Sequence, residues 1–242
     1  MAVLMIGGID SSGGAGVLRD CATAVAFGVG ARVAVTAVTA QTDRAVLAAE
    51  MCSPTTLAAQ INAAFAQGPV GAIKIGMLGT GAAVEEVAGA LVERPEVPVV
   101  LDPVIASSSG KALIDEAGLD VLLDRLLPLT TLITPNLPEA AQLAARLGVA
   151  EDAVSQALMD RGAGAVLIKG GHGDGAEVVD HLITPQTAHR FAVPRQQGSL
   201  RGTGCALAAA IACGLSQNHT LPDACRAAQA HIQHRFAAAR DQ

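Results

Sequence analysis

One cysteine stands where its thiol could take part in chemistry. In 201-RGTGCALAAAIACG-214, Cys205 follows a Gly-Thr-Gly turn directly before an apolar helical pattern. The start of a helix carries unpaired N–H groups and the positive end of the helix dipole, so it attracts anions and helps a thiol to lose its proton. The N–H groups of Gly202, Thr203, Gly204 and Cys205 would converge on one point, which suits the oxygens of a phosphoryl group.

Charged side chains follow other apolar runs. Asp102 ends one run before an Asp-Pro turn, Lys169 ends another just before Gly171, and Asn136 and Glu139 open a helical pattern. Mg²⁺ keeps several waters and needs only one or two carboxylates, so the two acids could hold it, and the lysine could reach a nucleotide phosphate. Each residue also has a purely structural explanation: a turn cap, an acid that favours the helix dipole, or a solvated strand end.

The first loop, 7-GGIDSSGGAG-16, is rich in glycine but matches neither the P-loop nor the dinucleotide-binding pattern. Its glycines, Gly8 among them, would let the backbone approach a substrate, with Asp10 or Asp20 available to hydrogen-bond it. The alternative is a flexible strand–helix turn in which Ser12 caps the helix.

The elements that must position these side chains alternate along the chain. Short apolar runs predict strands at 3–7, 31–38, 72–76, 97–102, 130–134 and 163–170, and longer patterns predict helices at 15–27, 54–67, 81–93, 114–126, 137–146 and 151–161. Two further strands, 177–183 and 189–194, predict an antiparallel edge, and helices at 203–216 and 220–238 follow. We expect an α/β fold with a mostly parallel sheet covered on both faces, and a site at the carboxyl ends of the strands. Lys74 lies within a strand, which indicates a buried, paired lysine.

Composition narrows the classes of function. The 242 residues are 51% hydrophobic with a net charge of −6, which favours a single domain over 1–242 and argues against nucleic acid or an anionic membrane as a partner. The longest apolar run, 206–215, is too short to span a bilayer, so we expect a cytoplasmic protein. The five cysteines show no paired spacing, and we expect free thiols.

Seven segments in this order resemble the hydroxymethylpyrimidine/phosphomethylpyrimidine kinases of thiamine biosynthesis, in the ribokinase-like superfamily. They cover nearly the whole chain and read GGIDSSGGAGV, AVTAVTAQTD, AIKIGML, VVLDPV, LITPNLPEA, VLIKGGHGD and GTGCALAAAIA. The resemblance implies a three-layer α/β/α fold. It also implies ATP- and Mg²⁺-dependent phosphorylation of 4-amino-5-hydroxymethyl-2-methylpyrimidine to the monophosphate and then to the diphosphate, by a homodimer.

The resemblance also implies roles for individual residues. Cys205 takes the position of the family's active-site cysteine, and Gly202, Thr203 and Gly204 form the anion hole with it. The positions matching the family's other site residues are Gln41 and Asp20 at the aminopyrimidine, Met77 along its ring, Lys169 beside the nucleotide, and Asp102, Asn136 and Glu139 on the Mg²⁺–phosphate side.

The chain departs from the family pattern at several positions. Ser11 replaces the proline of the first loop, 107-SSSG-110 lacks a lysine, Arg201 replaces a histidine, and Ala206 replaces a hydroxyl residue. Arg201 could pair with a substrate phosphate. These changes bear most on the second phosphorylation.

Two other functions stay open, and a third is less well supported. A pyridoxal kinase would share the fold and a similar set of loops, although the amide of Gln41 suits an aminopyrimidine better. A non-catalytic pyrimidine-binding protein would keep the pocket without turnover. A cysteine hydrolase would need a histidine base that spacing cannot place near Cys205.

Overall fold

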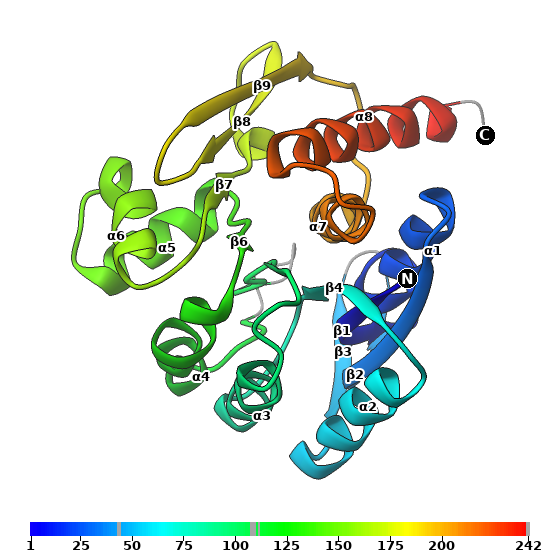
Figure 1. Ribbon diagram of the computed structural model, residues 1–242. Helices are drawn as coiled ribbons and strands as arrows, with labels where there is room; N and C mark the ends of the chain where they lie inside the picture. The colour runs from blue at the N-terminus through cyan, green and yellow to red at the C-terminus, as the bar shows by residue number, and fades with distance from the viewer. Residues whose placement is uncertain (43–44, 107–109, 111, 241–242) are drawn as a thin grey trace.

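The protein is built on one nine-stranded sheet with helices on both faces (Figure 1). The computed structural model describes residues 1–42, 45–106, 110 and 112–240, so 107–109 of the SSSG segment lie outside the described residues. The strands are β1 (Ala2–Asp10), β2 (Gly30–Gln41), β3 (Val46–Met51), β4 (Val70–Ile75), β5 (Val99–Leu101), β6 (Leu132–Ile133), β7 (Val166–Ile168), β8 (Glu177–Ile183) and β9 (Ala188–Pro194). The helices are α1 (Gly16–Ala26), α2 (Pro54–Ala66), α3 (Gly81–Val92), α4 (Glu116–Val121), α5 (Leu137–Leu147), α6 (Val154–Asp160), α7 (Thr203–Ser216) and α8 (Leu221–Arg240). A π-helical turn spans Leu122–Leu126, and 3₁₀ turns span Leu127–Leu129, Glu151–Ala153 and Gly170–His172.

The expected mostly parallel sheet is confirmed. Its strand order is β3-β2-β1-β4-β5-β6-β7-β8-β9, in which the strands from β2 to β7 run parallel and β8 and β9 form the predicted antiparallel edge. The predicted helix at 114–126 is divided into α4 and the π-helical turn.

The sequence did not predict β3, which makes the other edge antiparallel as well. Ala48 of β3 pairs with Ala40 of β2, yet the side chains between Leu47 and Glu50 are exposed. An edge strand with both faces in solvent has no apolar alternation, so only its pairing with β2 identifies it.

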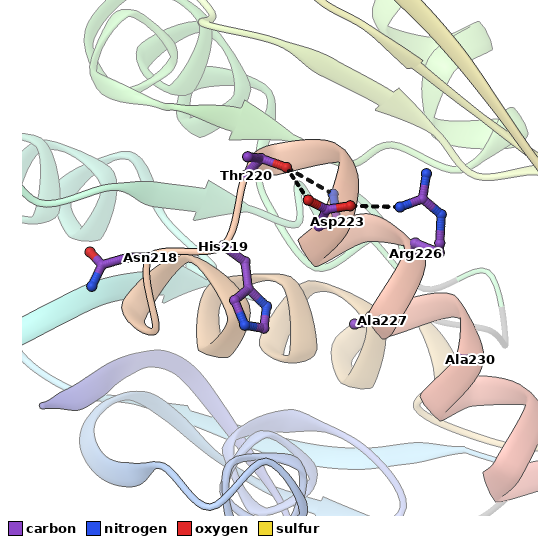
Figure 2. Close-up of a pocket in the computed structure, with 7 residues that line it drawn as sticks. All are labelled: Asn218, His219, Thr220, Asp223, Arg226, Ala227 and Ala230. Carbon is purple, nitrogen blue, oxygen red and sulfur yellow. Dashed lines mark hydrogen bonds and ion pairs between the residues drawn. The ribbon is translucent and has the colours of Figure 1, made fainter.

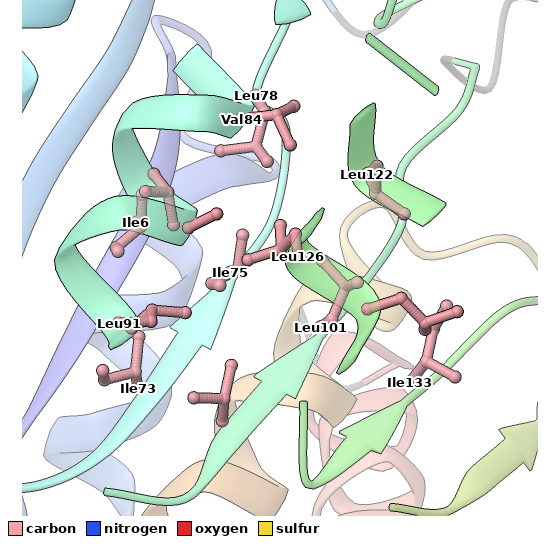
Figure 3. Close-up of a cluster of buried hydrophobic side chains, with 14 of the residues drawn as sticks. Ile6, Ile73, Ile75, Leu78, Val84, Leu91, Leu101, Leu122, Leu126 and Ile133 are labelled. Carbon is pink, nitrogen blue, oxygen red and sulfur yellow. The ribbon is translucent and has the colours of Figure 1, made fainter. Parts of the chain in front are cut away.

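Successive residues of the central strands face opposite helical layers. In β1, Leu4 and Ile6 pack into the cluster built with α2, α3 and α5, whereas Val3 and Met5 pack into the cluster built with α1, α7 and α8. Figure 3 shows part of the first cluster, where side chains of β4 and β5 meet those of α3. Burial on both faces explains why the strands appear in the sequence as unbroken apolar runs.

Helix α7 lies between the sheet and α8 (Figure 1). All residues from 206 to 214 are buried, and most are alanine, so the backbone can approach its neighbours closely. Its contacts with β1, β4 and β5 place its N-terminus at the carboxyl edge of the sheet. In the part of the chain that the structure describes, none of the helices is both long and apolar enough to cross a bilayer.

The strand order reverses beside β1, because β2 lies on one side of it and β4 on the other. Helix α1, which follows β1, belongs to the layer of α7, whereas α3, which follows β4, belongs to the opposite layer. The chain therefore leaves β1 toward one face of the sheet and leaves β4 toward the other. The crevice at such a point is the usual ligand site of an open α/β sheet.

Candidate active site

Three residues predicted to contact substrate lie at the ends of adjacent strands. Gly8 is in β1, Gln41 ends β2, and Met77 comes just after β4. A methyl group on Gly8 would lie 3.2 Å from Met77 Sδ, so the approach of Met77 to β1 favours glycine. Thr39 Oγ1 donates to Ile9 O at 2.8 Å and also lies 3.2 Å from Gln41 Oε1. The structure brings Gly8 and Met77 together and places Gln41 beside Ser11 at the end of the neighbouring strand. The contact of all three with a substrate stays a prediction.

Asp10 organises the first loop. Its Oδ1 accepts hydrogen bonds from Ser12 N and Ser12 Oγ at 2.9 and 2.7 Å, and its Oδ2 accepts from Ala15 N at 2.9 Å and Arg201 Nη2 at 3.1 Å. A carboxylate has about four acceptor positions, so these contacts occupy it fully. The proposed Ser12 cap is wrong, since Ala15 is the N-cap of α1. The contact of Asp10 with a substrate stays a prediction.

Lys74 is the buried, paired lysine that its place within a strand indicated. Its Nζ donates to Asp20 Oδ2 at 2.8 Å, and neither side chain is more than 1% exposed. Burial raises the pKa of Asp20 to about 6 although Lys74 opposes the shift. Burial alone would lower the pKa of Lys74, but Asp20 raises it. Asp20 Oδ1 has no hydrogen-bond partner among the described residues, and its predicted substrate contact stays a prediction.

Lys169 joins two acids at the other half of the edge. Its Nζ lies 2.7 Å from Asp102 Oδ1 and 3.9 Å from Glu139 Oε2, and all three residues are buried. Burial would lower the pKa of Lys169, but Asp102 and Glu139 together raise it. Burial raises the pKa of Glu139, and Lys169 limits that shift. The structure therefore holds a positively charged Lys169 between two acids at the carboxyl edge of the sheet.

Asn136 and Glu139 form a capping box at the start of α5. Asn136 Oδ1 accepts from Glu139 N at 2.8 Å, and Asn136 N donates to Glu139 Oε2 at 2.9 Å. Asn136 also forms an isolated parallel β-bridge with Lys169, so the cap and the lysine are held side by side. Gly171 lies exposed in the 3₁₀ turn that follows. The cap explains why both polar residues stand at this helix entrance, and their nucleotide contacts stay predictions.

The N-terminus of α7 lies over the Lys169–Asp102 pair. A methyl group on Gly204 would be 3.4 Å from Lys169 Nζ and 3.7 Å from Asp102 Oδ2. The N-cap, Gly202, has a positive φ of 67°, and among the described residues no side chain caps the helix there. The N–H groups of Thr203, Gly204 and Cys205 come before Ala206, whose N–H makes the first helical hydrogen bond, to Gly202 O. They therefore have no acceptor within the helix. The predicted anion hole thus adjoins the predicted nucleotide lysine.

Cys205 is half-buried and differs from the expected acidic thiol. Burial raises its pKa, and although Lys74 lowers it, Asp20 and Asp102 raise it further. The backbone N–H of Gly16 points at the sulfur. The expectation of easy proton loss is therefore wrong, because desolvation and two nearby acids outweigh the favourable neighbours. The expected free thiols are confirmed for all five cysteines.

The acids fit a metal that takes few protein ligands. Glu139 Oε2 is held by Asn136 N–H and lies near Lys169, so this oxygen suits a water-mediated contact. Asp102 Oδ1 is held by Lys169, while Oδ2 faces the N-terminus of α7 at Gly204. Among the described residues, no three His, Cys, Asp or Glu side chains form a metal cluster. One carboxylate oxygen with phosphates and waters is a set that suits Mg²⁺.

Two residues that the sequence did not single out support the turn after Lys169. Buried Asp180 in β8 accepts from Gly170 N at 2.9 Å and from Gln229 Nε2 at 3.2 Å. Arg195 donates to Gly171 O at 2.8 Å and to Gly175 O at 2.7 Å. Their partners lie 10 to 49 positions away in the chain, beyond the reach of a helical or turn pattern, so no such pattern indicated them.

A surface pocket of about 600 Å³ lies away from all of these residues, at the turn between α7 and α8. Figure 2 shows that Asp223 accepts hydrogen bonds from Thr220 and Arg226. These three polar side chains of the pocket therefore pair with one another. Because α7 has 14 residues and rises about 1.5 Å per residue, this end lies about 20 Å from the anion hole. The pocket holds none of the predicted site residues.

Comparison with known proteins gives consistent matches. The family model described as phosphomethylpyrimidine kinase matches residues 10–241. The hydroxymethylpyrimidine/phosphomethylpyrimidine kinase of Rhizobium meliloti is 39% identical, over 98% of this chain and 90% of its own length. A crystal structure of phosphomethylpyrimidine kinase from Clostridium difficile matches with a TM-score of 0.85 and 32% identity, covering 98% of this chain and 99% of that one. A pyridoxal kinase from Staphylococcus aureus in complex with AMP-PCP and pyridoxal matches with a TM-score of 0.85 and 29% identity, covering 96% of this chain and 86% of that one.

Proposed function

This chain belongs to the phosphomethylpyrimidine kinase family, and from that membership we propose that it phosphorylates 4-amino-5-hydroxymethyl-2-methylpyrimidine with ATP, and then phosphorylates the monophosphate, for thiamine synthesis. The observation that carries the proposal is the meeting of the N-terminus of α7, which no described side chain caps, with a buried lysine at one point, where Gly204 adjoins Lys169 and Asp102. That arrangement suits a transferring phosphoryl group, because phosphoryl transfer depends on positioning and charge stabilisation.

Backbone N–H groups and side chains have separate roles in the proposed reaction. The N–H groups of Thr203, Gly204 and Cys205 bind the oxygens of the transferring group at the start of α7. Lys169 stays protonated because its pKa is raised, so it offsets the negative charge of the nucleotide phosphates. Gly8 and Gln41 hold the acceptor ring at the ends of β1 and β2.

The proposed metal is Mg²⁺, which Asp102 and Glu139 would hold. When bound, it neutralises charge on the phosphate oxygens. Asn136 holds Glu139 in place through the capping box and so orients the carboxylate.

Cys205 has different tasks in the two proposed steps. In the first step it accepts the proton of the hydroxymethyl group, after giving up its own proton to solvent. In the second step the acceptor is an anionic phosphate, which needs no base. The same site can therefore serve both acceptors while using its thiol in only one step.

Mass spectrometry of product formation tests the proposal. The protein is incubated with ATP, Mg²⁺ and hydroxymethylpyrimidine, and with pyridoxal in a parallel reaction. Monophosphate followed by diphosphate is the expected result. Monophosphate alone would remove the second step from the proposal, and no product from either compound would support a binding protein without turnover.

A pyridoxal kinase is the second candidate, because a pyridoxal kinase of Staphylococcus aureus shares the fold with a TM-score of 0.85. The amide of Gln41 can both donate and accept at an aminopyrimidine edge, which favours the pyrimidine. Competition between the two compounds in one reaction decides: the pyrimidine should be consumed first.

The setting of the enzyme is proposed as well. We place it in the cytoplasm, as a homodimer of single-domain chains. Exposed apolar residues such as Val38 and Leu47, 50% and 69% exposed at the β2–β3 edge, support a contact between copies. Light scattering after size-exclusion chromatography should give twice the mass of 24.3 kDa.

A further inference from the structure

The first loop and the start of α7 are in backbone contact, although they lie far apart in the sequence. We call residues 11–15 the glycine loop and residues 201–204 the α7 turn. A methyl group on Gly202 would lie 2.2 Å from Gly14 O, and one on Gly14 would lie 3.0 Å from Arg201 Nη1. The fit is so close that a side chain at Gly202 would displace the glycine loop.

Arg201 bridges the two segments through its guanidinium. Its Nη1 donates to Ser12 Oγ at 2.9 Å, and its Nη2 donates to Asp10 Oδ2 at 3.1 Å. Asp10 is only 3% exposed, so the arginine supplies a cationic partner to a buried carboxylate. A paired hydrogen bond of this kind fixes direction as well as distance.

Two further arginines hold the backbones on either side of this bridge. Arg19 of α1 donates to Gly13 O at 3.1 Å and to Gly14 O at 3.4 Å. Arg235 of α8 donates to Arg201 O and Gly202 O, both at 3.4 Å. The glycine loop and the α7 turn are therefore each held to a helix, and Arg201 joins them.

We propose that Arg201 is a positioning residue that fixes the glycine loop relative to the anion hole, and thereby sets the distance between the bound acceptor and Cys205. This inference rests on the proposed function. The loop leads directly into Gly16, whose N–H points at the Cys205 sulfur, so movement of the loop changes the surroundings of the thiol. A misplacement of about 1 Å can cost about 100-fold in rate.

Kinetics of Arg201→Ala test the proposal. Loss of both bonds should raise the KM for the pyrimidine and lower kcat, with kcat/KM falling roughly 10- to 100-fold, while the KM for ATP stays unchanged. Arg201→Lys keeps the positive charge on a single donor nitrogen and should restore part of the loss. Ser12→Ala should cost less in the Arg201→Ala background than in wild type, because the contact between Ser12 and Arg201 is already gone while the bond from Ser12 Oγ to Asp10 is still lost. Arg226→Ala, which removes an exposed arginine of α8, is the matched control and should behave as wild type.

Hydrogen exchange provides a readout that does not depend on activity. The amides of Ser12 and Ala15, which donate to Asp10, should exchange faster in Arg201→Ala than in wild type or Arg226→Ala. Unchanged exchange overturns the proposal, even if kcat/KM falls, because Arg201 would then act on the substrate directly. Should Arg201→Ala fail to fold, Arg201→Lys and Ser12→Ala provide the same comparison. If the wild type forms no product, the proposed function fails, and the exchange data still decide the role of Arg201.

Discussion

Cys205 is a thiol whose acidity depends on more than its helix. Its place at the start of α7 favours the thiolate, and so does Lys74, yet burial and the nearby Asp20 and Asp102 raise its pKa. At neutral pH the resting site therefore contains a protonated thiol. Any step that uses this sulfur as a base must first remove that proton.

Cys205→Ala should lower the single-turnover rate of the first phosphorylation more than that of the second. The first acceptor is an alcohol that must lose a proton, and loss of a general base typically costs about 100-fold or more, whereas the second acceptor is already anionic. Rapid-quench measurement with each acceptor compares the two steps. Equal losses would contradict the base role, and Cys52→Ala, at a half-buried cysteine beside β3, should leave both rates unchanged.

The pH dependence of the first step should reflect the raised thiol pKa. Because a raised pKa leaves less thiolate at a given pH, the rate should increase as pH rises from about 6 to about 9 and should not level off near neutrality. The second step should lack this increase. A plateau of the first step below about pH 7 would show that the thiolate is not the group that titrates.

Short polar turns at the ends of β5, β6 and β7 position the charged groups of the site. The capping box at α5 fixes Glu139 and lies in register with Lys169 through the bridge at Asn136. The turn after Lys169 depends on β8, where Asp180 accepts the N–H of Gly170. A methyl group on Gly170 would lie 2.0 Å from Val179 O, so this turn packs directly on the β8 backbone. The antiparallel edge therefore supports the part of the site proposed to bind the nucleotide.

Asp180→Ala should raise the KM for ATP several-fold and destabilise the fold by about 1–3 kcal/mol, because the part-buried N–H of Gly170 and the buried amide of Gln229 lose their acceptor. Asp180→Asn keeps one acceptor oxygen and should show a smaller effect. Steady-state kinetics and thermal unfolding measure the two quantities. A wild-type KM for ATP in the Ala variant would show that β8 does not position the turn, and Asp223→Ala, at an exposed acid, is the control.

At the scale of the whole molecule, a buried ion pair joins the sheet to the α7 layer. Lys74 projects from β4 on the face where α1 and α7 pack, and Asp20 of α1 meets it. Removing one partner leaves a charge in an apolar interior, which is costly. The pair thus couples the position of α1, which follows the glycine loop, to the centre of the sheet.

Lys74→Met and Asp20→Asn should each destabilise the protein by about 3–5 kcal/mol, and the double variant should lose less than the sum of the two. Each single change leaves the other group without its partner, whereas the double change removes both charges. Urea unfolding measures the three free energies. Additive losses would show that the two side chains do not stabilise one another, and Arg226→Ala should change little, because that ion pair is exposed.

The sequence by itself determined the alternation of buried strands and helices, and with it the parallel sheet and the edge where polar loops gather. It also indicated a paired Lys74 and a helix that begins at Asn136. These features follow from periodicity, turn residues and caps, which act between residues close in the chain.

Only the tertiary structure decided which polar groups meet. Arg201 reaches Asp10 across 191 positions, Lys74 reaches Asp20 across 54, and Lys169 reaches Asp102 across 67. The same packing formed β3 on an edge without apolar alternation and raised the pKa of Cys205. Burial and electrostatic interactions depend on distance in space, and that distance is set when the carboxyl ends of the strands come together.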